Sequence, residues 1–406
     1  MNRTSHRLAL PFVSGLALTL AAACPPGESP AAAGTSMGLV SGEPPVPTPL
    51  DGHKPSVQIA ILLDTSNSMD GLIAQAKSQL WTIVNTLATA KHKGVRPSLQ
   101  VALYEYGKSS LPSGEGFLRQ ILPLTTDLDE VSAQLFALTT NGGEEYCGHV
   151  IDAATKGLLW SDRSDDLRFI LIAGNEPFTQ GGIDYRHSIP MAVKKGIVVN
   201  TIHCGNEQVG IETNWKDGAL LGEGAYSFID TNAAAVHIPS PYDAQITTLS
   251  NALNKTYLGY GSQGLAMAER QSAQDSNAAS AAPGAAVQRA QTKAGEQYRN
   301  VHWDLVDAVK EKVVSLATVD ADELPEEMRG MTVEQREAHV RKLETERVNI
   351  QRQIGELSRK REEFVASERA KHQNSQARTL EGAVIGALQA QAKRKGYEFD
   401  PPAAGR

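Results

Sequence analysis

A short apolar strand that ends in a polar loop is the feature that most constrains how this chain folds. Residues 57–63 are apolar apart from Gln58 and are rich in Val, Ile and Leu, which is typical of a strand buried on both faces of a parallel sheet. The loop 64–68 (DTSNS) follows, and helical periodicity continues over 72–87. In an open α/β sheet ligands bind beyond the carboxyl ends of the strands, so this loop lies where a ligand is expected.

Asp64, Ser66 and Ser68 are small oxygen donors at alternating positions of that loop. One carboxylate and two hydroxyls suit a hard divalent cation, either Mg²⁺ or Ca²⁺. The alternative is that Asp64 or Ser66 only caps the following helix, a role that both residue types fill well. The buried strand before the loop and the amphipathic helix after it favour the cation site.

The first residues have the pattern of an export signal. Basic side chains precede an apolar stretch, 8–23, that is too short for a comfortable membrane span, so we predict a signal peptide over 1–24. Cys24 follows small residues as in a bacterial lipobox, although Ala21 stands where leucine is usual. The alanines before Cys24 also suit an ordinary signal-peptidase site. We expect a protein of the cell envelope on the periplasmic side, lipid-anchored to the membrane through Cys24, or otherwise a secreted protein.

Composition and periodicity divide the rest of the chain. Strands alternate with helices over 56–261, which predicts an α/β fold with a doubly wound, mainly parallel sheet. The other predicted segments are a flexible linker over 25–55, a low-complexity connection over 262–295, a helical or coiled-coil region over 296–396 and a tail over 397–406.

The helical region is predicted to contain a helix over 298–316 and a longer one that begins after Thr332, where Gln335 completes a capping box. Arg347 and Arg361 interrupt the heptad seam of the long helix. This pattern suits an antiparallel hairpin or a modest coiled coil, through which the chain would self-associate, and the alternative is a long helix packed on its neighbours. The apolar seam positions are Val333, Val340, Leu343, Ile350, Ile354, Leu357 and Phe364.

The segment from Ser56 to about Leu258 resembles a von Willebrand factor A domain. The loop 64–68 matches the first part of that family's metal-ion-dependent adhesion site, and the alternation of strands and helices around it makes the match specific. The resemblance covers about half of the chain. It implies a cation-bearing rim that recognises a partner protein, often with a carboxylate of the partner completing the metal shell.

Two parts of the family's site differ here. Glu144 or Glu145 falls where the family has a threonine, and Gly174 falls where it has an aspartate. Glu176 is then expected to supply the missing carboxylate, with Asn175 as a carbonyl donor. An added carboxylate favours Ca²⁺. Two alternatives remain, a site completed within the chain that is structural and a site that has lost its metal.

Two cysteines remain after the signal peptide, Cys147 and Cys204, and export favours a disulfide between them. The resemblance places both at the same rim. A zinc site that adds His149 and His203 is an alternative, with poor spacing, and free thiols are another. Trp215 is expected to anchor the core, with a partner contact as its alternative.

Charge and motifs narrow the class of function. The net charge of −7 argues against a general nucleic-acid binder. The chain carries no nucleophile elbow, P-loop, zinc-protease motif or dinucleotide fingerprint. We therefore expect a non-enzymatic, metal-dependent module for adhesion or scaffolding that binds a partner protein. The alternatives are a non-catalytic subunit of chelatase- or protease-like machinery and a structural envelope protein.

Overall fold

The computed structural model describes residues 54–231, 237–371 and 379–399. The predicted signal peptide with Cys24, nearly all of the predicted linker and the end of the predicted tail lie outside these described residues. Within the described ranges, no helix combines the length and the apolar composition that a membrane crossing requires.

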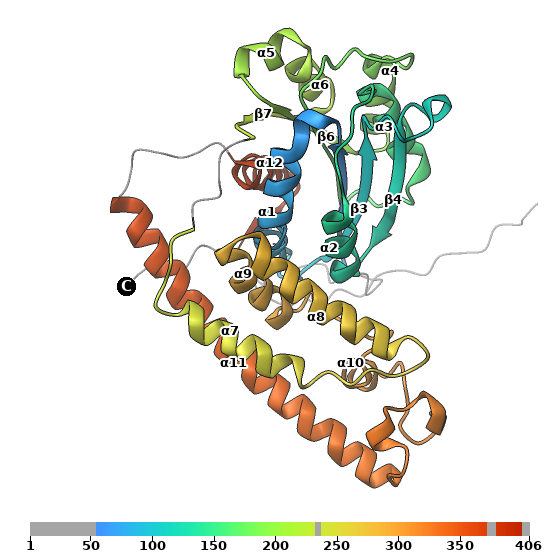
Figure 1. Cartoon of the computed structure of the whole chain (residues 1–406), viewed down its shortest axis with the longest axis vertical. Helices are drawn as coiled ribbons and strands as arrows, with labels where there is room; N and C mark the ends of the chain where they lie inside the picture. Colours follow the sequence, from blue (N-terminus) through green and yellow to red (C-terminus); the bar gives the residue numbers. More distant parts are fainter. Residues whose placement is uncertain (1–53, 232–236, 372–378, 400–406) are drawn as a thin grey trace, which may run out of the picture. The chain divides into compact units, whose positions relative to one another are not determined.

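A six-stranded sheet forms the centre of the fold, in the order β4-β3-β1-β5-β6-β7 (Figure 1). Every neighbouring pair is parallel except β3 and β4. The predicted fold class, a mainly parallel α/β sheet followed by a helical region, is confirmed. The strands are β1 (Ser56–Asp64), β3 (Ser98–Tyr106), β4 (Leu118–Thr125), β5 (Leu167–Gly174), β6 (Val198–Cys204) and β7 (Glu223–Ile229).

Strand β1 is buried on both faces, as its apolar run predicts. Ile59 and Leu63 belong to the core on one face of the sheet, and Ala60 and Leu62 belong to the core on the other. Gln58, the only polar residue inside the run, is buried but exchanges hydrogen bonds with Gln100 (2.7 Å) and the Ser161 N–H (2.7 Å). The strand therefore buries its one amide at little cost, because both ends of that amide have partners.

Helices cover both faces of the sheet. The core of the first face includes residues of α1, α2 and α12, and that of the second includes residues of α3, α4 and α6. These helices are α1 (Asp70–Ala88), α2 (Leu128–Ala137), α3 (Cys147–Gly157), α4 (Tyr185–Lys194), α6 (Trp215–Leu221) and α12 (Leu380–Arg394), with the short α5 (Glu207–Glu212) before α6.

The last helix, α12, belongs to the sheet and not to a separate helical region. Leu388 is fully buried in the core that α1 also covers, and α12 contacts α1, β6 and β7. Gln391 exchanges two side-chain hydrogen bonds with Asn200 of β6 (2.6 and 3.1 Å). Beyond α12, β8 (Tyr397–Phe399) pairs antiparallel with β2 (Ala90–His92), so the first residues of the predicted tail are a strand.

The segment 262–295, which the sequence predicts as a connection, forms α8 (Gly264–Ala281) and α9 (Pro283–Ala294). Helix α9 packs on α1, and α8 packs on α2. Small residues such as Ala278 and Ala285 are buried in the core of the sheet's first face. An alanine-rich composition therefore marks close helix packing here.

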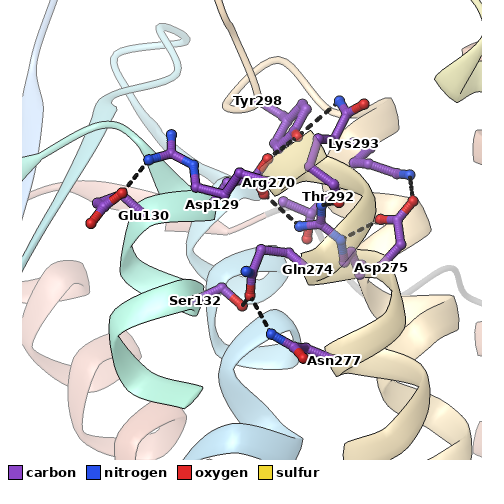
Figure 2. Close-up of polar contacts among 12 residues, drawn as sticks. Asp129, Glu130, Ser132, Arg270, Gln274, Asp275, Asn277, Thr292, Lys293 and Tyr298 are labelled. Carbon is purple, nitrogen blue, oxygen red and sulfur yellow. Dashed lines mark hydrogen bonds and ion pairs between the residues drawn. The ribbon is translucent and has the colours of Figure 1, made fainter. Parts of the chain in front are cut away.

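A buried ionic network fixes α8 and α9 to α2 (Figure 2). Arg289 of α9 is fully buried and donates to Asp129 of α2 (2.6 Å) and to Asp275 of α8. Lys293, also fully buried, donates to Asp275 (2.7 Å) and to Asn254 (2.6 Å). Because every charge has an opposite partner, the network makes the position of these helices specific, and removal of one member would leave a buried charge uncompensated.

The long helix α11 (Val333–Lys371) packs on α7 (Asp243–Asn254) and α9 and contacts α10 (Leu305–Lys310) (Figure 1). The predicted capping box forms, because Thr332 and Gln335 exchange side-chain to backbone hydrogen bonds (2.8 and 3.3 Å). The seam faces helices of the same chain, since Ile350 and Ile354 share a core with α7 and α9. The alternative of a helix packed on its neighbours thus describes the structure.

The two arginines that interrupt the apolar seam of α11 form ion pairs with acidic residues of other segments. Arg347 pairs with Asp304 (2.6 Å) and Asp307 (2.8 Å), and Arg361 pairs with Asp243 (2.8 Å). The helix predicted over 298–316 is reduced to α10, because Asp304 caps α10 by accepting from the Asp307 N–H. All of the described residues belong to one compact unit over 52–406.

Candidate cation site at the rim of the sheet

The candidate site lies at the edge where the parallel strands end. We call this edge the rim and define it as residues 64–70, 107–117, 139–146, 175–184 and 205–214, which are mainly loops and include the short helix α5. Backbone hydrogen bonds tie the loops together. The Asn141 N–H donates to the Thr65 carbonyl (2.9 Å), and the Ser109 N–H donates to the Gly142 carbonyl (2.5 Å). Segments distant in sequence thus form one continuous surface.

Asp64 occupies the centre of the rim and is fully buried. Its Oδ1 accepts a hydrogen bond from the Ser66 N–H (2.7 Å), while Oδ2 is buried and accepts no hydrogen bond of normal geometry. Burial raises the pKa of Asp64 to about 7, against the opposing effect of hydrogen bonding from Ser66 and from the Asn175 backbone N–H, whose approach to the carboxylate falls short of normal hydrogen-bond geometry. A buried carboxylate oxygen without a partner is costly, and a bound cation would remove that cost.

The two serines and Asn175 lie beside this carboxylate. The Ser66 and Ser68 hydroxyl oxygens are 3.2 Å apart, and Asn175 Nδ2 donates to Ser68 Oγ (3.1 Å). Asn175 Oδ1 is buried without a hydrogen-bond partner. Ser66 precedes the short 3₁₀ turn Asn67–Met69, but its side chain caps no backbone N–H there. The helix-capping alternative therefore does not account for Ser66.

The structure separates the two glutamates between which the sequence could not choose. Glu145 is buried, whereas Glu144 is exposed to solvent. Asp64 Oδ1 and Glu145 Cγ each lie 2.8 Å from the place that a Cβ on Gly107 would occupy, so the two carboxylate side chains are close neighbours. Burial, then repulsion from Asp64 and Glu176, raises the pKa of Glu145 to about 7. Glu145 is the rim carboxylate that faces Asp64.

Gly174 leaves no space for the aspartate that the family resemblance implies. A Cβ at this position would lie 2.5 Å from the Tyr106 hydroxyl and 3.0 Å from Asp64 Oδ2. The Tyr106 hydroxyl is held there by donating to the Ala173 carbonyl (3.0 Å). Glu176, the predicted substitute, accepts from Gln180 Nε2 (3.3 Å). The charge of Glu176 also raises the pKa of Asp64, so both glutamates lie close enough to act on this carboxylate.

Sequence reasoning missed Glu105, which supports the loop that carries Asp64. Glu105 is fully buried at the end of β3, where it pairs with Arg119 and accepts a long hydrogen bond from the Thr65 hydroxyl (3.4 Å). The Thr65 N–H also donates to the Tyr106 carbonyl (2.8 Å). A charged residue within an otherwise apolar strand is the signal that would have found it.

Trp215 anchors the core and positions the rim. It is fully buried, its ring packs edge-on against Phe178 (4.8 Å between centroids), and its Nε1 donates to the Glu176 carbonyl (2.9 Å). The indole thus fixes the backbone next to Asn175. The expected role as a core anchor agrees with this placement.

The predicted disulfide between Cys147 and Cys204 is not formed, and both thiols are free and buried. The physical reason is that Cys147 belongs to the core on one face of the sheet and Cys204 to the core on the other. Burial raises the pKa of both thiols, so neither is a ready thiolate ligand. His149 packs against Tyr146 (5.0 Å between centroids) and His203 against Trp215 (5.8 Å), away from the zinc arrangement considered as an alternative.

The donor set at Asp64 fits a hard cation that relies on neutral oxygens. Among the described residues, no three His, Cys, Asp or Glu side chains are grouped closely enough to hold a metal by themselves. A cation here would be held by Asp64, with hydroxyls of Ser66 and Ser68, the Asn175 carbonyl and Glu145 contributing. Oxygen-only ligands of this kind suit Mg²⁺ or Ca²⁺, and the partnerless Asp64 Oδ2 and Asn175 Oδ1 are the observations that fit it.

No protein-family model matches the chain, and no curated protein matches it in sequence. Among solved structures, BatB from Bacteroides thetaiotaomicron aligns with 43% of this chain and 91% of its own, at 18% identity and a TM-score of 0.32. The SpRpn10 VWA domain aligns with 44% of this chain and 90% of its own, at 15% identity and a TM-score of 0.34. Proximal thread matrix protein 1 from the mussel byssus, solved with a zinc-occupied MIDAS motif, aligns with 44% of this chain and 43% of its own, at 12% identity and a TM-score of 0.32. These alignments span less than half of this chain, and its fold is defined by its own strand order and pairing.

Proposed function

We propose that the protein is an exported, non-enzymatic module of the cell envelope that binds a partner protein at the rim in a divalent-cation-dependent manner. The observation that carries the proposal is Asp64. This carboxylate is fully buried at the end of the central strand, and its Oδ2 has no partner within the described part of the chain. Such an oxygen is stabilised by a ligand that the protein alone does not supply.

The rim is suited to recognition because it is assembled on a rigid base. Each loop is attached to a strand or helix of the core. Buried side chains also hydrogen-bond to the loops, since Trp215 donates to the Glu176 carbonyl and Glu105 accepts from the Thr65 hydroxyl. Binding residues on loops that a rigid scaffold positions are typical of protein-recognition sites. A bound cation would add positive charge to the centre of the rim and would fix the side chains of Asp64, Ser66 and Ser68 in one arrangement.

The helices α7 to α11 support the same role. They pack on the sheet's first face through α1 and α2, opposite to the face that α3 and α4 cover. The main contacts of α7 to α11 with the rest of the chain are therefore with α1 and α2 and not with the rim. These helices would provide rigid spacing or a second contact surface.

The proposal is tested by chemical cross-linking of the purified protein to envelope proteins in Ca²⁺ or Mg²⁺, and again in chelator, with Asp64→Asn as the matched variant. We expect a partner that is captured with cation present and is lost both in chelator and in the variant. A partner captured equally under all three conditions would show that the cation site plays no part in binding.

A further inference from the structure

The excess negative charge of the chain is concentrated in the rim. The rim loops contain nine acidic side chains and a single Lys or Arg, out of 46 acidic and 39 basic side chains in the whole chain. The remaining 37 acidic and 38 basic side chains nearly cancel. The acidic residues of the rim are Asp64, Asp70, Glu115, Glu144, Glu145, Glu176, Asp184, Glu207 and Glu212.

The one basic residue of the rim is neutralised within the chain. Lys108 Nζ donates to the Thr139 hydroxyl (2.9 Å) and lies 3.8 Å from a carboxylate oxygen of Glu105. Its side chain is only 14% exposed. Just beyond the rim, Arg186 is engaged by Asp217 (2.8 Å). The surface that a partner meets is consequently acidic.

The centre of the rim already contains the carboxylates that a cation needs. Asp64 and Glu145 are close neighbours beside Gly107, on the side where a Cβ of that residue would lie, and both are buried. Asp64 Oδ2 has no partner and is the independent sign that a ligand belongs there. One divalent cation balances these two carboxylates, and a third carboxylate brought by a partner would meet the negative charge of the acidic residues around it.

We propose that the rim binds a basic segment of its partner through Lys or Arg side chains, and that Glu145 supplies from within the chain the carboxylate that a partner would otherwise bring to the cation. This inference rests on the proposed protein-binding function of the rim. It names the chemistry of the partner as cationic, opposite to the acidic ligand that the family resemblance implies. Glu144 lies in the same loop as Glu145 and is exposed to solvent, so it can meet a basic side chain of the partner.

The test uses two labelled peptides of equal length, one rich in lysine and one rich in glutamate, titrated with the purified protein and followed by fluorescence anisotropy. Each titration is made at about 0.15 M salt, where surface charges farther apart than about 8 Å are screened, once with Ca²⁺ and once with chelator. The variants are Glu144→Gln and, as the matched control, Glu269→Gln, which removes another exposed acid from α8.

We expect the lysine peptide to bind in Ca²⁺ and to bind more weakly in chelator, because the cation fixes the side chains of the rim in one arrangement, and we expect the glutamate peptide to bind in neither condition. Glu144→Gln weakens the lysine peptide by about two- to fivefold, the range of a single exposed ion pair, and Glu269→Gln leaves it unchanged. The proposal is overturned if the glutamate peptide binds in Ca²⁺ and is released by chelator, if the lysine peptide fails to bind, or if both variants weaken it equally.

A parallel calorimetric titration of Ca²⁺ separates this inference from the proposed function. Ca²⁺ binding together with a bound glutamate peptide would overturn the cationic partner and leave cation-dependent recognition standing. The protein could instead fail to bind Ca²⁺ and still bind the lysine peptide in a way that depends on Glu144. That result would support a basic partner and would show that partner binding does not need a divalent cation.

Discussion

Replacement of Leu388 by alanine tests whether the last helix is part of the sheet's core. Leu388 is fully buried against the face of the sheet that α1 covers. The change removes three carbon atoms, worth about 2.4 kcal/mol of transfer free energy at about 0.8 kcal/mol each. A residual cavity in a well-packed core adds to this, so we expect a loss of about 3–4 kcal/mol in the free energy of unfolding.

The assay is urea unfolding of the purified protein, followed by tryptophan fluorescence, since Trp81 of α1 is buried in the same core. The matched control is Leu265→Ala on α8, where the leucine is 75% exposed and the expected change is under about 0.5 kcal/mol. We expect Leu388→Ala to lower the midpoint of a single transition without changing its slope. Equal effects of the two variants would refute the placement of α12, and so would a separate sheet transition that Leu388→Ala leaves unshifted.

Three further predictions concern the ionic network and the rim. Arg289→Met leaves the buried carboxylate of Asp129 without its cation, while Asp275 keeps Lys293, and should cost about 3–5 kcal/mol in urea unfolding, whereas a cost near zero would mean that the network is not formed. Gly174→Ala should cost about 1–3 kcal/mol through its clash with the Tyr106 hydroxyl. Tyr106→Phe added to it should recover part of that loss, and no recovery would exclude this clash as the cause. Burial raises the pKa of Asp64 from 3.8 and that of Glu145 from 4.5, each to about 7. The folded state then binds these protons more tightly than the unfolded state does, so stability in chelator should fall as the pH rises from about 4 to about 7. Saturating Ca²⁺ should reduce that fall, and a flat profile in chelator would contradict the burial of these groups.

The sequence predicted the sheet well because its signals are local. The apolar run 57–63 falls within β1 and the helical periodicity over 72–87 falls within α1, since each pattern specifies an element without reference to the rest of the chain. The Thr332 capping box formed for the same reason. Periodicity indicates that a helix exists and which face is apolar.

The sequence could not show what each apolar face packs against. Helix α12 lies within the region predicted to be helical over 296–396, but its packing on the sheet depends on partners far along the chain, such as Asn200. The segment that forms α8 and α9 has a weak apolar pattern because alanines and the buried Arg289 form its contacts. The disulfide between Cys147 and Cys204 was predicted from cellular location, and only the three-dimensional fold shows that the two thiols lie on opposite faces of the sheet.

The sequence predicted the part of the candidate site that lies in the loop 64–68, but not the part that other segments contribute. Asp64, Ser66 and Ser68 were identified because one loop contains all three. The choice between Glu144 and Glu145 depended on which side chain is buried beside Asp64, and adjacent residues in a loop give no sign of that. The Tyr106 hydroxyl that fills the space at Gly174 comes from a different strand, so its effect on the site is a tertiary property.

The central claim is that Asp64 organises a divalent-cation site at the rim, and isothermal titration calorimetry of Ca²⁺ and Mg²⁺ into the purified protein tests it most directly. The variant for comparison is Asp64→Asn, which preserves the shape of the side chain and removes its charge. We predict one bound cation per chain in the natural protein and an affinity at least about tenfold lower in the variant, because the only buried carboxylate oxygen without a hydrogen-bond partner among the described rim residues would be lost. No cation binding in the natural protein, or equal binding in both proteins, would contradict the account.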